Sequence, residues 1–109
     1  SSFWLEVKCR SFGIDKYDTL LLSASKLRMG AALSLATNRP FVLVFAMTDS
    51  VYSHTWDRNK VYDVRFGTIA EPILPEDSEP YIHFSRDELD CLSDKPLGFD
   101  REELGINYN

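Results

Sequence analysis

The stretch Phe-Trp-Leu-Glu-Val-Lys-Cys-Arg at residues 3–10 decides the first element of the fold. Apolar and polar side chains alternate along it, and this pattern predicts a β-strand. Successive side chains of a strand point to opposite faces, so Glu6 and Lys8 lie on the same face. The other face is apolar, and we expect it to contact the core; its members are Phe3, Leu5, Val7 and Cys9.

A carboxylate and an ammonium group on one strand face suit metal-assisted cleavage of a phosphodiester. Glu6 can hold a divalent cation, with the Val7 carbonyl as a second oxygen ligand. Lys8 can orient or deprotonate the attacking water, or stabilise the charge of the transition state. The alternative interpretation is an ordinary ion pair between Glu6 and Lys8 on a surface strand.

A helix is predicted after this strand. Ser23 is a suitable N-cap, and Pro40 disfavours helical geometry before it, so the helix runs to about residue 38. Residues at spacings of three and four form a polar stripe on this helix; they are Ser23, Lys26, Gly30, Ser34 and Thr37. A broad apolar face is expected to pack on the sheet; its members are Ala24, Leu27, Met29, Ala31, Ala32, Leu35 and Ala36.

The remaining elements are predicted from apolar runs and turn residues. Residues 41–47 are apolar on both faces, which indicates a central strand covered on both sides. Further strands are expected at residues 51–56, 61–66 and 81–84, and a loop at residues 67–80. Residues 20–22 fit either a short strand or the entry to the helix. A capping box at Ser85 predicts a helix of about two turns.

The order of these parts resembles the PD-(D/E)xK nuclease superfamily, in particular small phage-type nuclease domains. The resemblance rests on the Leu-Glu-Val-Lys strand, on the alanine-rich helix with Lys26, and on the stretch from Pro40 through Leu43 and Val44 to Asp49. It extends to the acidic Glu-Pro segment at residues 76–84 and so covers residues 3–92.

The resemblance implies an α/β (α+β) fold with a restriction-endonuclease-like core, in which a helix packs on a mixed central sheet after the E-x-K strand. It implies hydrolysis of DNA that depends on Mg²⁺ or Mn²⁺. Glu6, Lys8 and Lys26 would be the catalytic residues, and Glu6 and the Val7 carbonyl would be the metal ligands. Lys26, which matches the helix lysine of the family, would contact a DNA phosphate; a solvated polar stripe is the alternative. Arg10 shares the strand face of Glu6 and can meet a backbone phosphate, and Ser25 can assist through its hydroxyl group. A salt pair is the alternative role for Arg10.

One part of the family pattern has no counterpart. The P-D aspartate of the family lies on a strand before the E-x-K strand, and only Ser1 and Ser2 stand there. We therefore expect a core that is truncated at its N-terminus, or a substitute acid such as Asp15 or Asp18, or an inactive domain. A turn or capping role is the alternative for these two aspartates.

Composition and charge bound the remaining choices. The chain has 109 residues and a net charge of −5, with +3 in residues 1–70 and −8 in residues 71–109. We expect a nuclease-like core at residues 1–92 and an acidic, weakly structured tail at residues 93–109. Two cysteines make no disulfide framework, and no apolar run is long enough to span a membrane. These features favour the cytoplasm, which would be the host cytoplasm for a phage protein.

Two other classes of function stay open. The first is a non-catalytic module that uses the same scaffold to bind nucleic acid or protein. The second is a phage accessory protein in which Glu6 and Lys8 form only a surface ion pair. Association into a homodimer is not decided by the sequence.

Overall fold

The structure is a computed structural model that describes residues 2–66 and 80–97. The strand predicted at residues 3–10 is confirmed as β1 (Trp4–Cys9). It pairs in parallel with β3 (Phe41–Ala46), and β3 pairs antiparallel with β4 (Val51–Thr55). Strand β7 (Asp90–Ser93) joins the far edge of β4, so the sheet is mixed and has the order β1-β3-β4-β7.

A second, antiparallel sheet is built from three strands in the order β2-β6-β5. Residues 20–22, which fitted either strand or helix, belong to β2 (Thr19–Ser23). This strand pairs with β6 (Pro80–Ser85), and β6 pairs with β5 (Val64–Phe66). The predicted loop at residues 67–80 lies outside the described residues except for its last position, where β6 begins.

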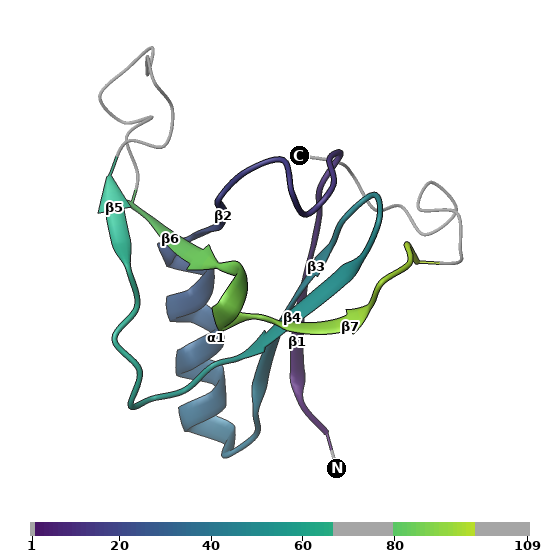
Figure 1. Cartoon of the computed structure of the whole chain (residues 1–109). Coiled ribbons are helices and arrows are strands. Elements are labelled where there is room, and N and C mark those ends of the chain that lie inside the picture. Colours follow the sequence, from purple (N-terminus) through teal and green to yellow (C-terminus); the bar gives the residue numbers. More distant parts are fainter. Residues whose placement is uncertain (1, 67–79, 98–109) are drawn as a thin grey trace.

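Helix α1 (Ala24–Thr37) follows β2 directly and links the two sheets. It contacts β1 and β3 of one sheet and β2 and β6 of the other, and Figure 1 shows it between β5–β6 and the four-stranded sheet. Asn38 ends the helix in the left-handed conformation, with φ 54°, and its N–H donates to the carbonyl of Ser34. The described residues thus form an α+β fold with one α-helix.

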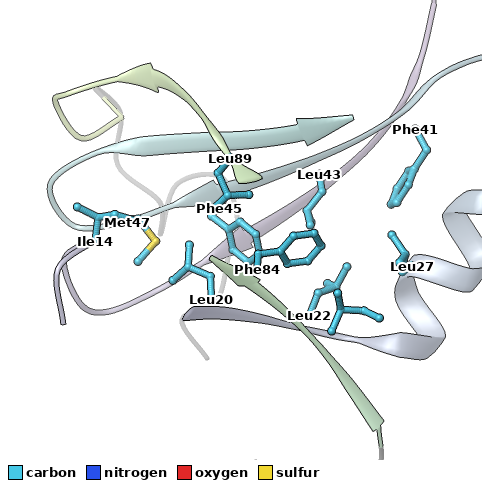
Figure 2. Packing of buried hydrophobic residues seen from close by; sticks show 11 residues of the cluster. Ile14, Leu20, Leu22, Leu27, Phe41, Leu43, Phe45, Met47, Phe84 and Leu89 are labelled. Carbon is cyan, nitrogen blue, oxygen red and sulfur yellow. The ribbon is translucent and has the colours of Figure 1, made fainter. Parts of the chain in front are cut away.

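The core lies between the two sheets (Figure 2). Phe45 of β3 meets Phe84 of β6 edge to face, with 5.9 Å between ring centroids, and neither side chain is exposed to solvent. Edge-to-face contact suits the quadrupoles of two aromatic rings. The other core side chains come from both sheets, α1 and the connecting segments; they are Ile14, Leu20, Leu22, Leu27, Phe41, Leu43, Met47, Ile82 and Leu89.

The face of β1 that was predicted to be in the core is largely on the outside. Cys9 is buried as expected, but Leu5 is 53% exposed and Phe3 is 55% exposed. The reason is the pairing with β3. Register partners in a parallel pair share a face, and the core residues Leu43 and Phe45 are partners of Glu6 and Lys8. The side of the sheet that carries Glu6 and Lys8 is therefore the covered side.

The predicted apolar face of α1 is also wrong in part. Leu27 is buried as expected, but Met29 is 62% exposed and Leu35 is 58% exposed. The helix instead buries Leu27 and Gly30, which stand three positions apart on one face. Gly30 was assigned to the polar stripe, but its missing side chain allows the helix to approach the ring of Phe41 closely.

The helix predicted after Ser85 is a single turn. The capping box forms, but η2 (Arg86–Glu88) is a 3₁₀-helix of three residues, and Leu89 is already extended. The chain then becomes β7, because the open edge of β4 offers backbone partners there. Of the predicted tail at residues 93–109, residues 98–109 lie outside the described part. Within residues 2–66 and 80–97, no helix has the length and apolar character that a membrane span requires.

The first prediction concerns the contact between α1 and β3. A Cβ atom added at Gly30 would overlap the ring of Phe41, which is only 4% exposed and has little room to move. We expect Gly30→Ala to lower the free energy of unfolding by about 1–3 kcal/mol, despite the better helix propensity of alanine. Urea denaturation measures this. The loss should be much smaller in a Phe41→Leu background, and an equal loss there would contradict the proposed overlap.

The second prediction concerns acid stability. Lys60 donates to Glu88 over 2.7 Å, and the Ser85 backbone N–H also donates to it over 2.7 Å. The Lys60 contact foremost, with the Ser85 hydrogen bonds, lowers the pKa of Glu88 from 4.5 to about 2. A carboxyl group whose pKa is lower in the folded state stabilises the fold at pH values above its unfolded-state pKa. This stabilisation is lost as the pH falls through the folded-state pKa. Glu88→Gln should therefore lower the free energy of unfolding by about 1 kcal/mol at pH 7, and this difference from the wild type should vanish near pH 2.

Denaturation of both proteins across this pH range measures the difference in the free energy of unfolding. Lys60→Gln should weaken the same pH dependence, because it removes the main cause of the lowered pKa. A cost of Glu88→Gln that stays constant from neutral to acid pH would contradict the assignment.

Candidate functional site

The predicted E-x-K pair lies at the rim of the covered face. Glu6 and Lys8 stand in β1, the terminal strand of the four-stranded sheet, on the side that faces α1 and the second sheet. Their side chains are 30% and 21% exposed, so both reach solvent at the edge of the core. The expectation that they lie on the same face of a strand is confirmed, and α1 contacts this strand.

Glu6 and Lys8 form a loose ion pair. The distance between Glu6 Oε1 and Lys8 Nζ is 3.8 Å. Partly exposed pairs of this kind contribute on the order of 0–1 kcal/mol to stability. The contact is therefore too weak to prevent either group from binding a different partner.

A pocket of about 390 Å³ opens beside Lys8, and Glu6 is not among the residues that line it. Lys8 of β1 and Lys26 of α1 both line it, which brings together two residues that are 18 positions apart in the sequence. The other polar residues of the wall come from the position just after β1 and from β2, α1 and β6; they are Arg10, Ser23, Ser25 and Tyr81. We call this site the basic pocket.

The first turn of α1 contributes hydroxyl groups to the basic pocket. Ser23 takes the predicted N-cap position, but its side chain makes no capping hydrogen bond to the helix. The Ser23 and Ser25 hydroxyl groups instead contact each other over 2.8 Å. The amino end of a helix carries a partial positive charge, which adds to the charge of Lys8 and Lys26. The pocket therefore favours an anion.

Arg10 is partly occupied by the fold. Its Nη2 donates to the carbonyl of Leu21 over 2.7 Å, and its guanidinium group lies 5.8 Å from the centroid of the Phe45 ring. Burial lowers the pKa of Arg10 below its ordinary value. An arginine nonetheless stays protonated at neutral pH. Arg10 thus joins β1 to β2 and at the same time supplies a fixed positive charge to the pocket wall.

Among the residues that the structure describes, no second acid joins Glu6 in a metal-binding group. Asp15 forms an ion pair with Arg86 of η2. Asp49 accepts from the Ser50 hydroxyl and from the Ile14 N–H, and these hydrogen bonds lower its pKa. Within the described ranges, no three His, Cys, Asp or Glu side chains gather as a metal-binding group.

Sequence reasoning missed Tyr81 and Ser23 as parts of one site. They are partners across the β2–β6 ladder, yet they are separated by more than half of the chain. No local pattern indicates this pairing, because β6 has no turn that connects it to β2. Only the long-range contact places Tyr81 in the wall of the basic pocket.

Comparisons with known proteins add no relatives. No family model matches the chain, and neither the characterised proteins nor the solved structures contain a significant match.

The third prediction concerns the charge of the basic pocket. If the basic pocket holds a DNA phosphate, Lys26→Gln should weaken binding of a short DNA duplex and should reduce the slope of log K against log salt by about one. Fluorescence anisotropy at several salt concentrations measures both quantities. Arg39→Gln is the matched control, since it removes one charge near the opposite end of α1. Equal effects of the two variants would contradict a specific role for Lys26.

Proposed function

We propose that this chain carries the E-x-K part of a metal-dependent DNA nuclease with a restriction-endonuclease-like core. One observation carries the proposal. Lys8 and Lys26 line the same pocket, and Glu6 is the ion-pair partner of Lys8. A carboxylate, a lysine and a second cationic group at one point are what hydrolysis of a phosphodiester requires.

The donors at this point suit a hard divalent cation. Glu6 offers carboxylate oxygens and Val7 offers a carbonyl oxygen, and Mg²⁺ prefers oxygen ligands. Mg²⁺ commonly binds through one or two carboxylates together with substrate phosphates and water. When bound, Mg²⁺ or Mn²⁺ would neutralise charge on the scissile phosphate.

Each side chain has a separate task in this proposal. Lys8 would hold the attacking water and stabilise the negative charge that develops on the phosphate oxygens. Lys26 would hold a backbone phosphate of the DNA in the basic pocket. Ser25 would add a hydroxyl donor to the same phosphate, and Arg10 would supply a fixed positive charge.

One observation favours a second candidate, a binding module without catalysis. Among the residues that the structure describes, Glu6 has no further carboxylate with which to form a metal group. The positive wall of the basic pocket would then serve to bind DNA phosphates alone. This function predicts that DNA binds with a strong salt dependence and is not cleaved.

The fourth prediction separates these candidates. If the chain is a nuclease, it cleaves DNA in the presence of Mg²⁺ or Mn²⁺, and Glu6→Gln and Lys8→Met each lower the rate by roughly a hundredfold or more. Gel assays with linear and circular DNA measure the cleavage. Lys95→Met is the control, because Lys95 is exposed and lies outside the basic pocket.

The folding of each variant is checked by circular dichroism before the assay. Full activity of Lys8→Met would exclude the assigned mechanism. Wild-type protein that binds DNA but does not cleave it with either metal would favour the binding module.

A further inference from the structure

Strand β1 leaves one edge of the four-stranded sheet without a partner strand among the described residues. It is regular over its whole length, with an unbroken register from Trp4 to Cys9 and no proline or bulge. Leu5 is 53% exposed and Val7 is 38% exposed. An edge strand presents unpaired N–H and C=O groups, which are a template for another strand. A lysine such as Lys8 discourages this pairing unless the incoming strand supplies an opposite charge.

The backbone of β1 shows which groups are offered at this edge. Trp4 donates its N–H to Pro40 and Arg10 donates its N–H to Ala46, so the even-numbered residues bond toward β3. In a parallel ladder, the N–H and C=O of one residue point to the same side. Leu5, Val7 and Cys9 therefore direct their backbone groups away from β3, toward the open edge. The Cys9 carbonyl also accepts a hydrogen bond from Arg10 Nη1 over 3.4 Å, which leaves its second lone pair for a partner strand.

The side chains of β1 are complementary to themselves. If two copies of β1 pair antiparallel with Val7 opposite the partner's Val7, then Glu6 lies opposite the partner's Lys8. The twofold axis repeats this pair, so two ion pairs form. Side chains in such non-hydrogen-bonded positions approach closely, and opposite charges there are stabilising.

Neighbouring registers are disfavoured by charge. Only the odd-numbered residues of β1 offer backbone groups at the open edge. In a symmetric dimer, these residues must therefore lie opposite odd-numbered residues of the partner. One adjacent register places Glu6 opposite the partner's Glu6, and the other places Lys8 opposite the partner's Lys8. The second of these also places Glu6 opposite the partner's Arg10, but Arg10 is held by its hydrogen bond to the Leu21 carbonyl. Like charges directly opposite each other are destabilising.

We propose that two copies of this chain associate edge to edge through β1, antiparallel and centred on Val7. Leu5 and Cys9 exchange backbone hydrogen bonds across the interface, as do the two copies of Val7. The result is a twofold-symmetric dimer with a continuous sheet, in which the same surface serves both subunits. The inference does not rest on the proposed nuclease function, because it needs only the edge and the charges of β1.

The test uses charge reversal and measures mass by analytical ultracentrifugation from micromolar to near-millimolar protein. Wild-type protein should dimerise. Glu6→Lys places lysines opposite each other, and Lys8→Glu places glutamates opposite each other, so each variant alone should dimerise at least roughly tenfold more weakly. An equal mixture of the two variants should restore the dimer, since every facing pair is then of opposite charge.

A further variant tests the backbone. The N–H of Val7 points outward, so Val7→Pro removes a hydrogen bond of the dimer and none of those to β3; an edge strand tolerates such a proline. We expect a folded monomer by circular dichroism and ultracentrifugation.

Three results would overturn the proposal. They are a wild-type monomer at every concentration, a Val7→Pro protein that still dimerises, and a wild-type dimer whose two charge variants do not recombine. In the first case, protection of the Val7 amide from hydrogen exchange would show that another segment of the chain pairs with β1.

Discussion

The parallel pairing of β1 with β3 is the constraint on which the rest of the structure depends. Two parallel neighbours cannot be joined by a tight turn, so the chain must return across one face of the sheet. Here the return contains β2 and α1. Because α1 contacts β1 and β3, its first turn lies beside the Glu6 and Lys8 side of the sheet. The juxtaposition of Lys8 and Lys26 follows from this connection.

The contact between the two sheets determines how far this face is buried. Phe45 and Phe84 fill the centre, and the polar side chains of β1 remain at the rim. Burial of an unpaired charge is costly, whereas a charge at the rim keeps part of its hydration. The fold can therefore keep Glu6, Lys8 and Lys26 close to an apolar core without losing its stability.

Both proposals involve the backbone of β1 at Val7. The proposed metal ligand on the backbone is the Val7 carbonyl, and the same carbonyl accepts a hydrogen bond in the proposed dimer. A carbonyl oxygen has two lone pairs, so the two contacts need not exclude each other. Dimerisation would also bring the partner's Glu6 toward Lys8, which places a second carboxylate near a site that has one in the described chain.

The sequence by itself determined the elements that depend on local pattern. Alternation from Phe3 to Arg10 is enough for a strand with Glu6 and Lys8 on one face, and Ser23 with Pro40 is enough to bound the helix. Only the tertiary structure decided which face of β1 is covered. Alternation separates the two faces of a strand, but it does not show which face the rest of the protein packs against. The tertiary structure also made Gly30 a packing residue, tied Arg10 to the carbonyl of Leu21, and turned the chain after Leu89 into β7. These outcomes depend on partners that are distant in the sequence, and a local pattern carries no information about them.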